Sequence, residues 1–182
     1  MTARCLLLVG PSQIGKDSLI RRLVGEHGFS YHLNATTRLP RGPVGDHQEY
    51  EFLSVPEFQQ RILGGRFVDW DFYAGNYYGV RPMDPDRPNP VMHCGAGMSL
   101  RISSSDPAYV PIFLAPAHAD LHRDRILATF GAEESTRRLE MMEEELTHRP
   151  LFEHVVAVED YASTDVVVEQ VLGIQRRLSG QT

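Results

Sequence analysis

The stretch "CLLLVGPSQIGKDSLIRRLVGEHG", residues 5–28, constrains the fold more than any other part of the chain. It opens with an apolar run that is typical of a buried strand. Gly10, Gly15 and Lys16 follow with the spacing G-x-x-x-x-G-K, and the apolar residues after them predict an amphipathic helix that ends near Gly28. Strand, glycine loop and helix form the first half of a parallel α/β unit.

The glycine loop has the composition of a phosphate-binding site. Glycines let backbone N–H groups converge on phosphate oxygens, the helix N-terminus adds its positive pole, and Lys16 can bridge the β- and γ-phosphates of ATP. The next position usually carries a hydroxyl that ligates Mg²⁺, whereas this chain has Asp17 followed by Ser18. We therefore expect ATP and Mg²⁺ as cofactors, with Asp17 and Ser18 as metal ligands. The residues expected to bind ATP are Gly10, Ser12, Gly15, Lys16, Asp17 and Ser18.

After residue 88 the chain alternates between apolar runs and helical patterns. The segments "PVMHC", "YVPIFLAP" and "HVVAVE" are typical of core strands. The segments "EESTRRLEMMEEELTH" and "STDVVVEQVLGIQRRL" predict helices, the second with Ser163 as its N-cap. This alternation predicts an α/β fold, a P-loop doubly wound parallel sheet formed by residues 1–33 and 88–182.

Residues 34–87 interrupt the alternation. Prolines, glycines and aromatic residues are frequent there, and the one clear helical pattern is "SVPEFQQRIL", with Ser54 as its N-cap. We expect an inserted, β-rich subdomain within a single domain of residues 1–182.

Composition narrows the class of protein. The chain has 182 residues, 42% of them hydrophobic and 23% charged, with a net charge of −6, which is the balance of a soluble globular domain. The negative charge argues against nucleic acid as a partner, and no apolar run has the length of a signal peptide or a membrane span. Cys5 and Cys94 lack ligand-like spacing and are expected to be reduced thiols. We expect a cytoplasmic monomer or homodimer that binds a small molecule, and no nucleic acid or membrane.

The insertion resembles the guanylate kinase family. The likeness rests on "TTRLPRGPVGDHQEYEFLSVPEF", "GGRFVDW" and "GNYYG", which follow the phosphate loop in family order and at family spacing. It spans most of the chain and is most specific up to Gly79. The resemblance implies that residues 34–87 are a monophosphate-binding subdomain and that residues from about 125 to about 140 are a short lid.

The resemblance also implies an acceptor site. In that family the counterparts of Arg38, Arg41, Tyr50 and Tyr78 hold the phosphate of a nucleoside monophosphate. The chemistry agrees, because two guanidinium forks and two phenol hydroxyls can bond to all the oxygens of a phosphate group.

The base-reading part of the family pattern is incomplete in this chain. Guanylate kinases read guanine with a serine, a glutamate, a second small hydroxyl residue and an aspartate, and the matching positions here are Asn34, Asp69, Val80 and Cys94. Val80 and Cys94 cannot replace a hydroxyl and a carboxylate. Asn34, Asp69 and Cys94 are therefore expected around the acceptor, and the changes predict doubtful guanine specificity.

The strand "PVMHCGAG" also departs from the family, because it lacks the family's acidic residues. Met92, His93 and Cys94 stand in that place. We hypothesise that Asp17 supplies the missing carboxylate near Mg²⁺. Ribose bisphosphate phosphokinases, which are distant relatives, have a loop similar to "GKDS" and likewise lack the strand acid.

The segment "HRDRILATFGAEESTRRLEMMEEEL" resembles the family lid, whose arginines lie over the transferring phosphoryl group. Arg138 matches a family arginine, and Phe130 stands where the family has another. Arg125 and Arg137 are candidates to replace it, although an exposed ion pair with a nearby glutamate explains Arg137 equally well. The residues expected to be catalytic are Lys16, Arg125, Arg137 and Arg138.

These features predict an ATP-dependent kinase of a phosphate monoester, with a nucleoside monophosphate as the expected acceptor. Two alternatives stay open. A ribose 1,5-bisphosphate phosphokinase is favoured by "GKDS" and by the incomplete base reader, whereas Arg41 and Tyr50 favour the nucleotide kinase. The second alternative is a non-catalytic guanylate-kinase-like binding module. The retained Gly15 and Lys16 argue against it.

Overall fold

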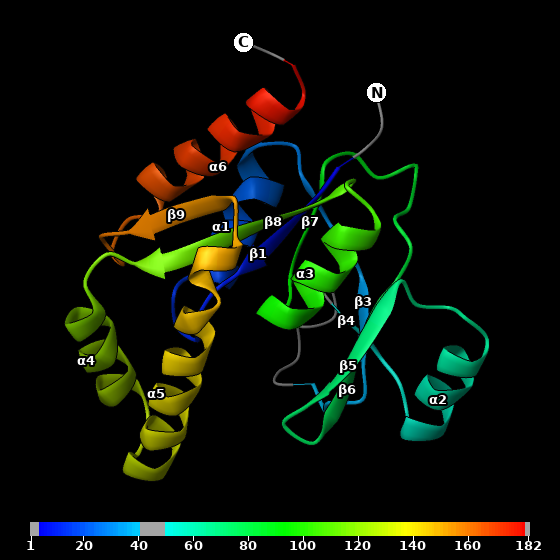
Figure 1. The fold of residues 1–182 in the computed structure, drawn as a ribbon, viewed down its shortest axis with the longest axis horizontal. Coiled ribbons are helices and arrows are strands. Elements are labelled where there is room, and N and C mark those ends of the chain that lie inside the picture. The colour runs from blue at the N-terminus through cyan, green and yellow to red at the C-terminus, as the bar shows by residue number, and fades with distance from the viewer. Residues whose placement is uncertain (1–3, 41–49, 181–182) are drawn as a thin grey trace.

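The computed structural model describes residues 4–40 and 50–180 (Figure 1). Its larger sheet has five strands in the order β2-β7-β1-β8-β9, and all neighbours are parallel. The chain leaves the central strand β1 first toward β2 and later toward β8, so the carboxyl end of β1 is a topological switch point, the usual ligand site of such sheets. The strands are β1 (Cys5–Val9), β2 (Ser30–Tyr31), β7 (Pro90–His93), β8 (Tyr109–Pro116) and β9 (His154–Val158).

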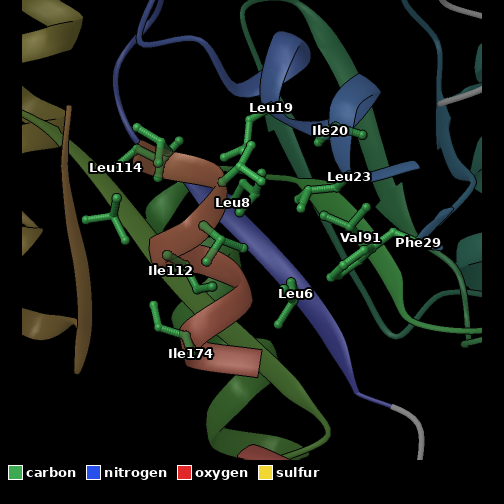
Figure 2. Packing of buried hydrophobic residues seen from close by; sticks show 14 of the residues in the cluster. Leu6, Leu8, Leu19, Ile20, Leu23, Phe29, Val91, Ile112, Leu114 and Ile174 are labelled. Carbon is green, nitrogen blue, oxygen red and sulfur yellow. The ribbon is translucent and has the colours of Figure 1, made fainter. Parts of the chain in front are cut away.

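Helices cover both faces of this sheet (Figure 1). The helices of the described chain are α1 (Lys16–Glu26), α2 (Val55–Leu63), α3 (Ala96–Ser105), α4 (Ala119–Thr129), α5 (Ala132–Thr147) and α6 (Asp165–Leu178), of which α2 lies away from this sheet. Successive residues of β1 point to opposite faces. Leu8 packs in the core cluster shared with α1 and α6, where Figure 2 also shows Leu19 and Ile174, and Leu7 packs in the cluster shared with α3.

A second sheet lies beside the first and has four strands in the order β4-β3-β6-β5 (Figure 1). The helix α2 covers it through Phe58, which is fully buried and stacks on Phe67 and Tyr77 with ring centroids 4.6 and 5.3 Å away. Gly79 makes room for these rings, because a Cβ there would lie 2.8 Å from Phe67. The strands are β3 (Asn34–Thr36), β4 (Tyr50–Phe52), β5 (Asp69–Tyr73) and β6 (Asn76–Val80).

The helices α4 and α5 pack against each other at the carboxyl edge of the large sheet (Figure 1). They follow β8 in the chain, and the 3-10 helix η2 (Arg149–Leu151) then leads into β9. This arrangement brings α5 beside the loop that follows β1.

The expected α/β fold, with a parallel sheet and an added β-rich part, is confirmed. One predicted cap is wrong, because α6 has Thr164 rather than Ser163 at its N-cap. Ser163 lies one residue too early, and its hydroxyl instead closes a local turn with the N–H and the carboxylate of Asp165. The boundaries of the subdomain and the lid stay predictions. No helix among the described residues combines the length and the apolar character needed to cross a membrane.

The predicted cap of α2 is present and can be tested. The Oγ of Ser54 accepts from the N–H of Glu57, whose carboxylate accepts from the N–H of Ser54. Ser54→Ala should lower the free energy of unfolding by about 1 kcal/mol, because it removes the acceptor. Urea unfolding measures the loss. Ser54→Thr keeps the hydroxyl oxygen, so its free energy of unfolding should fall by less than about half as much as that of Ser54→Ala. Equal losses in the two variants would contradict a capping role for Ser54.

Candidate functional site

The loop after β1 is fixed by close packing at its first glycine. Gly10 has a φ of 138°, and a Cβ there would lie 2.3 Å from the carbonyl oxygen of Leu114 in β8. Only glycine meets both constraints. Gly15 has a φ of 100° and is the N-cap of α1, so the loop ends at the positive pole of the helix dipole.

Lys16 is the first residue of α1 and folds back over the loop. Its Nζ donates to the carbonyl oxygens of Gly10 and Pro11 at 2.5 and 2.9 Å. Burial lowers the pKa of Lys16, while the negative charges of Asp17 and Glu145 act in the opposite direction. The ammonium group is thus held against the backbone of the loop.

Asp17 and Ser18 lie on the open side of the helix start. The side chain of Asp17 is 64% exposed, and its Oδ1 lies 3.4 Å from the Nδ1 of His93, the last residue of β7. The Oγ of Ser18 accepts from Arg21 at 3.2 Å. Asp17 therefore sits beside the end of β7, the strand in which the family's acidic residues are missing.

Three of the four residues predicted to hold the acceptor phosphate form one cluster. The guanidinium carbon of Arg38 lies 5.4 Å from the ring centre of Tyr50, and the rings of Tyr50 and Tyr78 meet edge to face at 6.3 Å. The Oη of Tyr50 lies 2.8 Å from the Nε2 of His93. The fourth residue, Arg41, lies outside the described residues.

Threonine hydroxyls anchor the backbone that presents Arg38. The Oγ1 of Thr36 donates to the carbonyl of Tyr77 at 2.9 Å, and the N–H of Tyr77 donates to the Oγ1 of Thr37 at 2.9 Å. Thr36 pairs with Tyr78 across the antiparallel strands β3 and β6. The "TTR" motif therefore holds Arg38 close to the β6 tyrosines.

The residues at the predicted base-reading positions differ in the contacts that their polar groups already make within the protein. Asp69 accepts from the Nε of Arg101 in α3 at 2.8 Å. Asn34 is buried beside Tyr50 around a small cavity of about 10 Å³, and its Oδ1 has no hydrogen-bond partner within the described chain. Burial raises the pKa of Cys94 to about 12, so its thiol stays neutral.

Arg138 of α5 reaches the phosphate loop. Its Nη1 donates to the Oγ of Ser12, and its Nε donates to Glu134 at 2.6 Å. Its guanidinium lies 4.0 Å from the ring centre of Phe130, which therefore supports Arg138 by a cation–π contact. Hydrogen bonds from Arg137 and Arg138 lower the pKa of Glu134 to about 2.

The other two candidate arginines differ in their contacts. The Nε of Arg125 donates to the carbonyl of Gln13 at 3.3 Å, and its guanidinium lies 4.9 Å from the ring centre of Tyr161. Arg137 pairs with Glu134 at 2.8 Å, one helical turn away, and its side chain is 49% exposed. The structure thus brings Arg125 to the phosphate loop and leaves Arg137 in an ion pair on the surface of α5.

His122 of α4 supports the loop from within the protein. It is fully buried, with its Nε2 2.9 Å from the carbonyl of Ser12 and its Nδ1 2.8 Å from the Oη of Tyr161. A carbonyl oxygen can only accept, so Nε2 carries the proton and Nδ1 accepts from Tyr161. Burial lowers the pKa of His122, which favours this neutral form.

Sequence reasoning missed the contacts of His93, Arg101 and His122. One sequence feature could have pointed to His93, because it ends a predicted strand, and ligands bind at the carboxyl edge of such sheets. Arg101 and His122 lie in helices with no motif around them, so only the packing reveals what they touch.

A glycine–lysine loop at the switch point of a parallel sheet, next to a cluster of arginine and tyrosine side chains, defines the class as a P-loop phosphotransferase. The model of the guanylate kinase family matches residues 2–173. The chain belongs to the guanylate kinase family, and it is a guanylate kinase-like phosphotransferase, a nucleoside monophosphate kinase, in a family that uses ATP as the phosphate donor.

Individual relatives agree with this assignment. The guanylate kinase of Gloeobacter violaceus is 32% identical over 179 residues, which cover 93% of this chain and 87% of that protein. The guanylate kinase of Rubrobacter xylanophilus is 32% identical over 186 residues, at 96% and 94% coverage. The crystal structure of guanylate kinase from Anaplasma phagocytophilum has a TM-score of 0.73 and 19% identity, covers 96% of this chain and 85% of that one, and supports the fold.

His122 should make stability depend on pH. Its folded-state pKa lies below its unfolded value near 6.5, so the unfolded chain takes up the proton first as the pH falls. The stabilisation is complete above the unfolded value and is lost as the pH falls through the folded-state pKa. Urea unfolding between about pH 7 and about pH 5 should show this decline.

The matched variants are His122→Gln and His118→Gln. The first should flatten the decline in part, because buried His32 also has a lowered pKa. The second removes an exposed histidine just before the same helix and serves as the control. A His122→Gln variant with the wild-type slope would contradict the role given to His122.

Proposed function

We propose that this protein transfers the γ-phosphate of ATP to a nucleoside monophosphate, with GMP as its acceptor and Mg²⁺ as its metal. One observation carries the proposal. The cluster of Arg38, Tyr50 and Tyr78 adjoins the phosphate loop, because His93 contacts both Tyr50 and Asp17. Transfer between two phosphates requires two adjoining anion sites. The similarity to guanylate kinases supports GMP as the acceptor.

On the donor side the loop supplies backbone N–H groups and Lys16 supplies a cation. Lys16 bonds to two loop carbonyls, and an ammonium with three rotatable donors can exchange such bonds for phosphate oxygens. The start of α1 adds its positive pole to the same place.

On the acceptor side, Arg38 and Arg41 supply guanidinium forks, and Tyr50 and Tyr78 supply hydroxyls. The acceptor phosphate is already ionised, so the reaction needs no general base, and positioning and charge do most of the catalysis. Arg138 bonds to Ser12 of the loop, which supports a role in neutralising charge on the transferring group.

The residues present fit Mg²⁺. This ion prefers oxygen ligands, keeps several waters, and binds through one or two carboxylates together with substrate phosphates. Asp17 is an exposed carboxylate next to Lys16, and Ser18 adds a hydroxyl. In residues 4–40 and 50–180 no group of three or more His, Cys, Asp or Glu side chains could hold a metal alone, so a site shared with the phosphates is the form that fits. Bound Mg²⁺ would neutralise charge on the β- and γ-phosphates.

Few polar groups remain to read the base. Asp69 is paired with Arg101, Asn34 offers one open acceptor, and Val80 and Cys94 offer no charged or hydroxyl group. A polar pocket discriminates strongly between bases only when it provides a hydrogen-bonding group for each polar atom of the correct base. We therefore propose that GMP is preferred, with weak discrimination against other bases.

A panel of acceptors tests the proposal. With ATP and Mg²⁺, GMP should give the highest kcat/KM, and AMP should follow within about 100-fold because the base reader is incomplete. The panel also contains dGMP, pyrimidine monophosphates and ribose 1,5-bisphosphate, with phosphoryl transfer followed by a coupled ADP assay. A preference for the ribose ester would overturn the acceptor, and no turnover together with no ATP binding would support a non-catalytic module.

Asp17→Ser tests the metal site. The variant should need about tenfold more Mg²⁺ for half-maximal rate, because it loses a charged ligand or a charge that orders the ion's waters. Titration of the rate with Mg²⁺ at saturating ATP measures this. Asp124→Ser removes an exposed carboxylate from α4 and serves as the control. Wild-type Mg²⁺ dependence and turnover in Asp17→Ser would rule out a metal role for Asp17.

A further inference from the structure

His93 lies between the two halves of the proposed site. It ends β7, and its side chain is 22% exposed. Its Nε2 lies 2.8 Å from the Oη of Tyr50, and its Nδ1 lies 3.4 Å from the Oδ1 of Asp17. A single imidazole ring therefore contacts one residue of the acceptor cluster and one residue of the donor loop.

Regular strands hold this arrangement. The parallel pairing of β1 and β7 sets His93 opposite Leu8, close to the point where the phosphate loop leaves β1. Tyr50 begins β4 and pairs with Asn34 of β3. The rings of Tyr50 and His93 are 5.9 Å apart, so packing reinforces the hydrogen bond.

We propose that His93 is a positioning residue, which fixes the hydroxyl of Tyr50 for the acceptor phosphate and links it to the donor loop through Asp17. This inference rests on the proposed function. A tyrosine hydroxyl both donates and accepts, so it bonds to Nε2 in either tautomer of the ring. The role of His93 is therefore one of position.

The link has a consequence for binding. When ATP and Mg²⁺ bind beside Asp17, any movement of that carboxylate changes the contact with the ring that holds Tyr50. The donor and the acceptor should therefore affect each other's affinity, and by the same factor in both directions.

Two amide variants separate the two contacts. His93→Asn keeps a nitrogen near the Nδ1 position, so it retains the contact with Asp17 and loses the one with Tyr50. His93→Gln keeps a nitrogen near the Nε2 position, so it retains the contact with Tyr50 and loses the one with Asp17. The measurements are kcat and the KM of GMP at saturating ATP, and the dissociation constant of GMP by calorimetry with and without a non-hydrolysable ATP analogue.

His93→Asn should raise the KM of GMP about tenfold, the usual effect of losing one hydrogen bond at a charged ligand, while kcat changes less than about threefold. His93→Gln should leave GMP binding to the free protein within about threefold of wild type and abolish the change in GMP affinity that the ATP analogue causes in the wild type. His154→Asn in β9 is the control and should match wild type. Thermal unfolding of each variant checks that it is folded.

A double-mutant cycle completes the test. Tyr50→Phe should raise the KM of GMP at least as much as His93→Asn, because it removes both the hydroxyl that binds the phosphate and its contact with His93. The double variant should be within about threefold of Tyr50→Phe, because His93 acts through that hydroxyl. An unchanged KM in folded His93→Asn, or effects that multiply, would overturn the inference while leaving the kinase function intact. A wild-type chain that phosphorylates no nucleoside monophosphate would overturn the proposed function and this inference with it.

Discussion

At the point where the phosphate loop leaves the large sheet there is no room for a side chain, because a Cβ on Gly10 would lie 2.3 Å from the carbonyl oxygen of Leu114. This close contact fixes the place where the chain leaves β1 relative to β8, the neighbouring strand. The direction of the exit sets where α1 begins, and the start of α1 sets the positions of Lys16 and Asp17. A methyl group at Gly10 would therefore displace the start of α1, and with it Lys16 and Asp17.

The rest of the site is arranged around that loop by contacts from several elements. His122 of α4 bonds to the carbonyl of Ser12, and Arg138 of α5 bonds to the hydroxyl of the same residue. Tyr73 of β5 donates to the sulfur of Met141 in α5 at 3.3 Å, so α5 contacts the second sheet as well as the loop. This helix thereby connects the phosphate loop with the second sheet.

Local patterns predicted much of this structure from the sequence. The strands, the glycine loop and the cap at Ser54 depend on neighbouring residues, which a sequence displays directly. The adjacency of Arg38 and Tyr50 followed only from the resemblance to a family. The ion pair of Asp69 with Arg101 and the bond between Tyr50 and His93 could not be foreseen, because they join residues 32 and 43 positions apart whose distance depends on how the two sheets pack.

Arg101 connects α3 of the core to the second sheet through Asp69 and through the carbonyl of Trp70, at 2.8 and 3.4 Å. Trp70 is the only tryptophan of the chain, and 41% of it is exposed. Its side chain points to the opposite face of β5 from Asp69, and its ring lies 6.0 Å from that of Tyr77, which stacks on Phe58 of α2. The protein therefore carries its single indole fluorophore on the face of the second sheet that α2 covers, and its emission can follow the packing of this helix in the unlabelled chain.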